Sequence, residues 1–141
     1  MSRVKSAHLL LAACGAMALA ACETVAEEAN EAVGFEYTAM LTPSAAGGAG
    51  SGKAEISLND ATNMLCTDLE LSNDVSMTVG HIVGPGNSVI ADIDVPDDND
   101  SDDCDNITDA QLDAIKANPG AYKVHVGTTN GDLYGTLVKE G

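Results

Sequence analysis

The chain has 141 residues, which is enough for one domain, and its formal net charge of −16 reflects 22 acidic residues against six basic ones. This charge disfavours a nucleic-acid partner, because contacts to phosphates require a basic surface. It suits cation binding, or solubility through electrostatic repulsion. Aromatic residues make up 3% of the chain, so the core must be built mainly from aliphatic side chains.

The first 21 residues have the pattern of a bacterial lipoprotein signal peptide. Arg3 and Lys5 precede an apolar segment over residues 9–18, and the sequence LAAC that ends at Cys22 has the form of a lipobox, the site of lipidation and cleavage. The same form at Cys14 leaves too short an apolar segment ahead of it. The segment is also shorter than the roughly 20 residues that a transmembrane helix needs. We therefore expect Cys22 to be lipidated, with palmitate among its acyl chains.

Cleavage before Cys22 divides the chain into a signal peptide over residues 1–21, an acidic tether over residues 22–34 and a folded domain over residues 35–141. The tether is rich in alanine and glutamate and has no apolar stripe. Glu23 follows the lipidated cysteine, whereas aspartate there is the usual signal for retention at the inner membrane. We therefore expect the mature chain, with a net charge of −18, to be anchored to the outer membrane and to face the periplasm or the cell surface.

Alternating apolar and polar residues predict five strands in the first part of the domain. These strands cover residues 35–41, 54–58, 65–71, 77–83 and 89–95. A loop of small residues, a Ser-Asn-Asp turn and a Pro-Gly-Asn turn separate several of them, as strand connections require.

The second part of the domain begins with an acidic run, DVPDDNDSDDCDNITD, which we interpret as a solvated loop held at its middle by Cys104. Thr108 then caps a predicted helix over residues 109–117, with Leu112 and Ile115 as its buried pair. Alternation over residues 122–127, followed by Asn-Gly, predicts a closing β-hairpin. Together the elements predict an all-β domain, an antiparallel β-sandwich or Greek-key barrel of about seven strands with one short helix.

Two cysteines, Cys66 and Cys104, remain once Cys14 is removed with the signal peptide and Cys22 carries lipid. Because the chain is exported to an oxidising compartment, a disulfide between them is the natural expectation. A metal site is the weaker alternative, since the sequence has no CxxC and no Cys/His spacing of the kind that binds zinc.

The closing hairpin resembles that of the CHRD domain, the module named after chordin, in which a segment like NP-x-x-YYVNVHT precedes a G-E-I-R-G-Q-L strand. The matching residues are Asn118, Pro119, Tyr122, Val124, Val126 and Thr128, then Gly131, Asp132, Leu133, Gly135 and Leu137. An H-I-H-G element of the family is similar to the HIVG that begins at His81, and the resemblance extends over residues 35–137. It implies an extracytoplasmic, non-enzymatic module.

His81 and His125 are the first candidate metal ligands. In the family, the H-I-H and N-V-H-T elements place histidines on strands of one domain, where alternate positions share a face and could share a metal ion. This chain has Val83 and Gly127 at the positions of two of the family's histidines. The alternative is that His81 and His125 are structural or exposed.

Asp98, Asp100 and Asp102 are the second set of candidate ligands, because they have the 1, 3, 5 spacing of a calcium loop. Asp103 occupies the position at which an EF-hand needs glycine, so an EF-hand loop is not expected. Low-affinity binding of Ca²⁺ or another divalent cation and a simple solvated loop remain the two alternatives. No other cofactor is expected.

The sequence contains no G-x-S-x-G motif and no glycine loop that leads into a helix to bind phosphate, which favours a protein without enzymatic activity. Two function classes remain. The first is an interaction or structural module of the cell envelope, with an envelope protein as partner. The second is a divalent-cation or metal-binding protein that uses the acidic run, the histidines or both.

Overall fold

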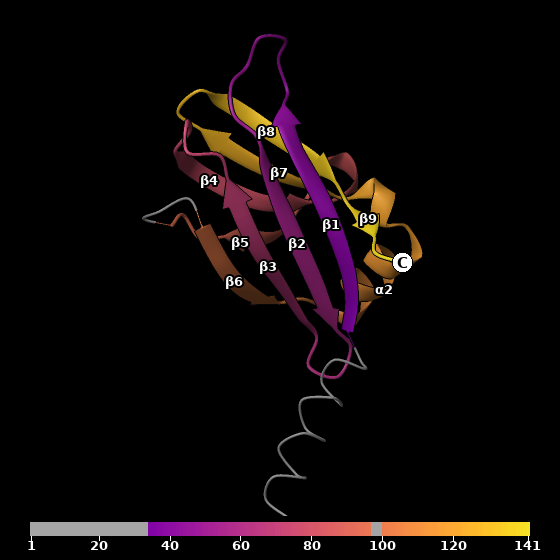
Figure 1. The fold of residues 1–141 in the computed structure, drawn as a ribbon. Helices are drawn as coiled ribbons and strands as arrows, with labels where there is room; N and C mark the ends of the chain where they lie inside the picture. The colour runs from indigo at the N-terminus through magenta and orange to yellow at the C-terminus, as the bar shows by residue number, and fades with distance from the viewer. Residues whose placement is uncertain (1–33, 97–99) are drawn as a thin grey trace, which may run out of the picture. The chain divides into compact units, whose positions relative to one another are not determined.

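The computed structural model describes residues 34–96 and 100–141, and these residues form a nearly closed antiparallel barrel of eight strands with one short α-helix (Figure 1). The strands are β1 (Gly34–Pro43), β2 (Gly52–Asn59), β3 (Met64–Leu71), β4 (Met77–Val83), β5 (Val89–Ile93), β6 (Asp100–Asn106), β7 (Lys123–Thr128), β8 (Gly131–Thr136) and the short β9 (Val138–Lys139). The predicted all-β fold is confirmed in its barrel form. The predictions for Cys22 and the rest of residues 1–33 lie outside the described residues.

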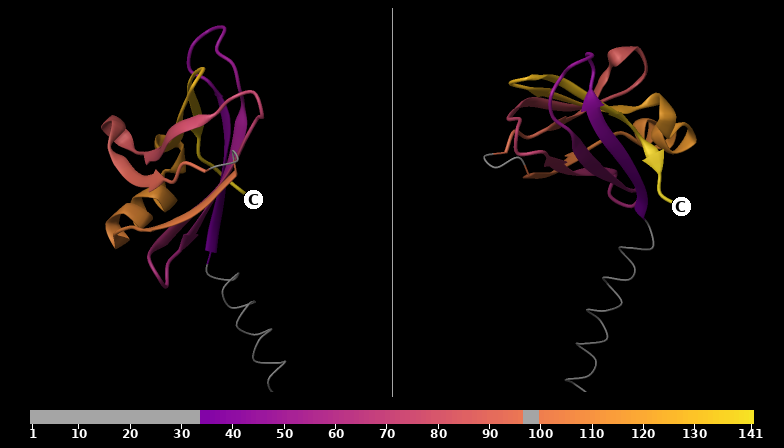
Figure 2. Two further views of the ribbon diagram at one scale, coloured as in Figure 1. Left: turned by 90° about the vertical axis from the view of Figure 1, so that its left-hand side faces the viewer. Right: turned by 45° about the horizontal axis from the view of Figure 1, so that its top comes forward.

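The strand order around the barrel is β5-β4-β7-β8-β1-β2-β3-β6, and β9 pairs with β1 beside this path. Figure 2 shows from two further directions that the strands curve around a common interior. β5 and β6 end the order on opposite sides, and they meet where the barrel closes. We call this junction the β5–β6 seam.

β1 joins the two halves of the barrel. Its residues 34–41 pair with β2, and its last two residues pair with β8 through Thr42↔Tyr134 and Pro43↔Leu133. At this crossing Gly135 is required, because a Cβ there would lie 2.7 Å from the Met40 carbonyl oxygen.

Inward side chains alternate with outward ones along the strands, as the period-2 pattern predicts. The aliphatic core expected from the composition is confirmed. The largest fully buried side chains are Tyr37, Leu41, Ile56, Leu58, Leu65, Leu69, Ile82, Ile115, Leu133, Leu137, Val124 and Val126.

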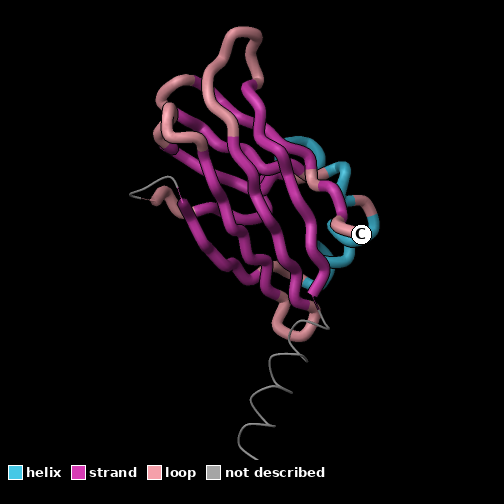
Figure 3. Tube along the Cα trace, viewed as in Figure 1, coloured by secondary structure: helices cyan, strands magenta, loops and turns pink. Residues whose placement is uncertain are grey.

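The predicted helix is confirmed as α2 (Asp109–Ala117), which lies with the short 3-10 helix η2 (Pro119–Ala121) beside the strands (Figure 3). Thr108 begins it with a capping box: Thr108 Oγ1 accepts from the Gln111 amide at 3.2 Å, and Gln111 Oε1 accepts from the Thr108 amide at 2.9 Å. Leu112 and Ile115 are buried, as expected. None of the helices within residues 34–96 and 100–141 is long and apolar enough to span a membrane.

The interpretation of the acidic run as a loop was wrong for its second part. Residues 100–106 form β6, paired antiparallel with β3 in a register that places Cys104 opposite Cys66. β3 supplies the backbone partners for this strand, so the pairing overrides the poor strand preference of aspartate. Asp98, one of the predicted cation ligands, lies outside the described residues.

The closing hairpin forms from β7 and β8, whose last pair is Thr128↔Gly131. Gly131 has a φ of +115°, a backbone region that favours glycine. Thr128 Oγ1 accepts from the Asn130 amide and donates to the Gly131 carbonyl, at 3.1 Å and 2.7 Å. The Asn130 side chain donates to the Asp74 carbonyl at 3.0 Å, which fixes the hairpin to the turn before β4.

Candidate functional site

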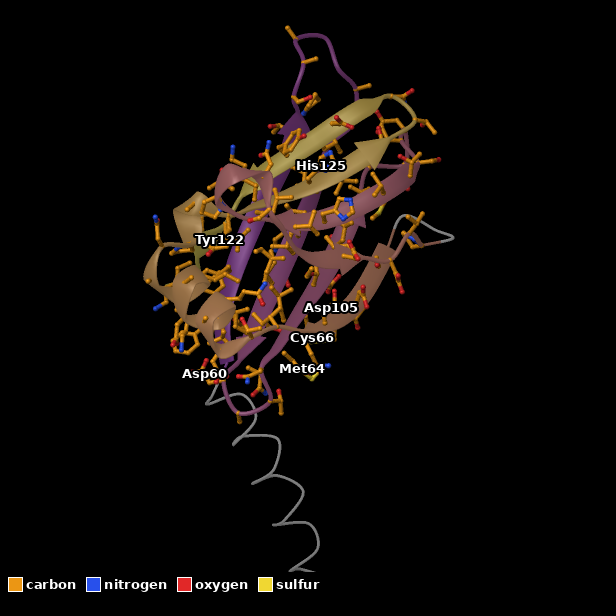
Figure 4. The ribbon with its side chains drawn as sticks, turned by 180° about the vertical axis from the view of Figure 1, so that it is seen from behind. Asp60, Met64, Cys66, Asp105, Tyr122 and His125 are labelled. Atoms are coloured by element: carbon orange, nitrogen blue, oxygen red, sulfur yellow. A yellow bond between two sulfur atoms is a disulfide. The ribbon has the colours of Figure 1, made fainter. Side chains whose placement is uncertain are left out.

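Four side chains form a row across the outer face of β5, β4, β7 and β8. The pairing places His81 opposite both Asp92 and His125, and His125 opposite Tyr134. The residues directly before and after each of them in the sequence face the barrel core. Because side chains alternate between the two faces of a strand, these four side chains point outward. We call Asp92, His81, His125 and Tyr134 the histidine row; His125 is labelled in Figure 4.

The histidine row is held by direct contacts. His81 Nδ1 lies 2.9 Å from Asp92 Oδ1, which is hydrogen-bond distance. The His81 and His125 ring centroids are 6.0 Å apart, and the Tyr134 ring stacks on the His125 ring at 4.6 Å with 16° between their planes. The structure therefore brings together the two histidines that the sequence singled out.

His125 has a polar atom without a hydrogen bond. Its Nε2 atom is buried and has no hydrogen-bond partner within residues 34–96 and 100–141, and the nearest carboxylate oxygen, Asp132 Oδ1, is 3.7 Å away. The side chains of His81 and His125 are 26% and 19% exposed, so part of each ring faces solvent although His125 Nε2 does not.

The row can offer imidazole nitrogen to a metal ion. When His81 donates its Nδ1 proton to Asp92, its Nε2 atom carries a free lone pair, and this carboxylate–histidine arrangement is common behind metal ligands. Within the described part of the chain, however, His, Cys, Asp and Glu side chains form no group of three or more that could hold a metal ion. Water would therefore complete the coordination of any ion held by the two imidazoles.

The acidic candidates lie on another part of the barrel. Asp102 is on the outer face of β6, opposite Asp68 of β3, and Asp100 pairs with Glu70. Neither residue is in the histidine row, and Figure 4 shows Cys66 and Asp105, which mark the β3 and β6 region, apart from His125. The two sets of predicted ligands are thus separate.

An open hollow of about 250 Å³ lies on the outer face of the strands β1, β2, β3 and β6. Its lining residues include five carboxylates and no basic residue. They are Glu36, Tyr37, Glu55, Ile56, Ser57, Cys66, Asp68, Asp102 and Glu140. We call it the acidic hollow.

The predicted disulfide between Cys66 and Cys104 is present on this same outer face. The two residues are direct partners of the β3–β6 pairing, and their Cα atoms are 4.0 Å apart. Cys104 is exposed and Cys66 is half-buried at the edge of the acidic hollow.

Two aspartates of β6 have a structural role that the sequence did not reveal. Asp105 Oδ2 accepts from the Asp92 amide at 3.1 Å, and Asp103 Oδ2 accepts from the Asp94 amide at 3.2 Å. Ser101 Oγ donates to the Asp94 carbonyl at 2.9 Å. These bonds join β6 to β5 across the β5–β6 seam. The alternation of Ser101, Asp103 and Asp105 was the available signal, but no apolar residue marked it as a strand.

Tyr37 is a further buried polar residue. It is 1% exposed, and its hydroxyl has no hydrogen-bond partner among the residues that the structure describes. Burial raises the pKa of this hydroxyl above its ordinary value, because the barrel interior disfavours the phenolate. Tyr37 therefore acts as a neutral core side chain.

Comparison with known proteins found no matching family model, no matching curated protein and no matching solved structure.

Proposed function

We propose that this chain is a lipid-anchored, extracytoplasmic and non-enzymatic module of the bacterial cell envelope, resembling the CHRD domain. The lipobox that ends at Cys22 carries this proposal, because it couples an export signal to a membrane anchor. The Cys66–Cys104 disulfide supports it, since such bonds persist in oxidising compartments outside the cytoplasm. A single small barrel on a lipid anchor suits a module that presents its surface to other envelope components.

Metabolic labelling with a fatty-acid analogue in the bacterial envelope tests the anchor. We expect the wild-type chain to carry the label and Cys22→Ser to carry none, because the lipid is attached to that thiol. Cys14→Ser is the matched control and should stay labelled, since it removes a cysteine with the same local sequence. Label retained by Cys22→Ser would contradict the assignment.

Transition-metal binding at the histidine row is a second candidate function, and the pairing of His81 with His125 favours it. Two imidazoles on adjacent strands with centroids 6.0 Å apart can approach one ion, and His81 has the Asp92 carboxylate behind it. Imidazole suits Zn²⁺, Cu²⁺ and Ni²⁺, whereas Ca²⁺ prefers oxygen ligands. The candidate ion is therefore a divalent transition metal bound with water as additional ligand.

Calorimetric titration of the chain with Zn²⁺ or Ni²⁺ tests this second function. We expect one ion per chain, and an affinity at least about tenfold lower in His81→Ala and in His125→Ala, because each removes one of two protein ligands. Asp102→Asn is the control, since Asp102 lies in the acidic hollow and not in the row. Binding that survives both histidine substitutions, or that depends on Asp102, would contradict this site.

A further inference from the structure

The amino-acid sequence of β6 is unfavourable for pairing with β3 as a strand. Four of its seven residues are aspartates, a residue depleted in strands. Asp102 lies directly opposite Asp68, and like charges at such cross-strand positions are destabilising. The backbone ladder to β3 therefore forms against electrostatic repulsion on the outer face.

The other side of β6 has no backbone ladder. Within residues 34–96 and 100–141, β6 pairs only with β3, and β5 meets it through the side-chain bonds of Asp103, Asp105 and Ser101. The Cys66–Cys104 bond is thus the one covalent connection of this strand to its neighbour.

The disulfide lies in a strongly negative surrounding. Asp68 and Asp102 are each two residues from the bonded cysteines and point to the same outer face. The acidic hollow adds Glu36 and Glu140, whereas its fifth carboxylate, Glu55, is paired with Lys53. Any reagent that approaches exposed Cys104 from outside meets this negative potential.

We propose that Cys66–Cys104 is a thiol-exchange site that selects positively charged thiols, and that its reduction releases β6 from β3. The reductant is a dithiol with basic groups beside its attacking sulfur. Its thiolate attacks Cys104 Sγ, the S–S bond breaks, and Cys66 leaves as a thiolate that takes up a proton. The second thiol of the reductant then displaces Cys104. Two electrons and two protons pass to the cysteines, and the reductant leaves as a disulfide.

Electrostatics sets the selectivity at two points of this exchange. An anionic thiolate is repelled as it approaches, and the departing Cys66 thiolate forms beside the carboxylates of the acidic hollow, which makes it a poor leaving group. Basic groups on the reductant offset both effects. This inference goes beyond the proposed module and depends on neither the lipid nor a metal ion.

The first test compares reduction of the full chain by cysteamine, which is cationic, and by mercaptoethanesulfonate, which is anionic. Rates are normalised to thiolate concentration, and alkylation with peptide mapping follows Cys66 and Cys104. We expect cysteamine to react roughly tenfold faster at low salt, because the carboxylates beside the disulfide attract a cationic thiol and repel an anionic one, and low salt screens them little. The ratio should approach one in 1 M salt, which reduces the Debye length to about 3 Å.

Variants locate the source of the selectivity. The double substitution Asp68→Asn, Asp102→Asn should lower the ratio, because it removes the two charges that share the outer face with the bonded cysteines. The double substitution Asp74→Asn, Asp113→Asn makes the same charge change at two exposed residues that do not line the acidic hollow, and it should leave the ratio as in the wild type. A ratio near one at low salt, or an unchanged ratio in the double variant, would overturn the electrostatic selection.

The second test measures amide hydrogen exchange of the wild-type chain before and after reduction. We expect residues 101–106 to exchange roughly a hundredfold faster once reduced, while Val124 and Val126 of β7 keep their protection, since local opening releases only weakly held segments. Unchanged protection of β6 would overturn the release. Equal loss of protection in β6 and β7 would also overturn it, because the whole barrel would then have opened.

Discussion

The double substitution Cys66→Ala, Cys104→Ala is expected to lower the free energy of unfolding by about 4 kcal/mol. The disulfide closes a loop with a sequence separation of 38 residues, and in the chain-entropy model its loss returns that conformational freedom to the unfolded chain. Because small domains are stable by about 5–15 kcal/mol, the loss is a large fraction of the total. Chemical denaturation followed by circular dichroism measures it.

Chemical reduction of the wild-type chain is the control, because it opens the same bond without changing the sequence, and it should lower the free energy of unfolding by a similar amount. A loss of less than about 1 kcal/mol in the double variant would contradict the expectation from loop closure. Such a small loss would mean that the unfolded chain is already constrained without the disulfide, or that the disulfide strains the native barrel.

Met77→Ala is expected to lower the free energy of unfolding by about 3 kcal/mol, as for other buried methionines. Met77 is 6% exposed, and its terminal methyl group fills the space left by the missing side chain of Gly80. The surrounding strands are fixed by their pairing, so a cavity remains. Urea denaturation of the variant beside the wild type measures the effect.

Met40→Ala is the matched control, because it makes the same chemical change on the outer face of β1, where Met40 is 67% exposed. Its free energy of unfolding should stay within about 0.5 kcal/mol of the wild type. Similar losses in both variants would show that the effect follows from the residue type and not from burial.

The strands and the helix could be predicted because their local signals agree with their surroundings. Leu65, Thr67 and Leu69 alternate with polar residues, so one face of β3 was evident without knowing its neighbours. Thr108 and Gln111 form a capping box that the cap residue already indicated. β6 could not be predicted, since its inward residues are serine and aspartate, and only β3 and β5 supply their partners.

The candidate site could be predicted only in part. Cys66 and Cys104 are the two cysteines that remain when Cys14 is assigned to the signal peptide and Cys22 to the lipid. Their pairing could therefore be predicted from the number of cysteines alone. The histidine row instead depends on the register between β4 and β7, which brings His81 and His125 together across a long stretch of chain. A shift of one residue would turn one of them into the core. Asp92 and Tyr134 belong to the row because of the β4–β5 and β7–β8 registers, and no local pattern in the sequence specifies these two registers.

The β5–β6 seam also has a consequence for self-association. A sheet that ends in an uncovered strand offers a row of free amides and carbonyls, onto which a second molecule can add a strand and start an aggregate. Here the carboxylates of Asp103 and Asp105 occupy amides at the open side of β5, and the negative charge of β6 repels another copy of the same chain. The aspartates that weaken β6 as a strand thus oppose the joining of two barrels edge to edge.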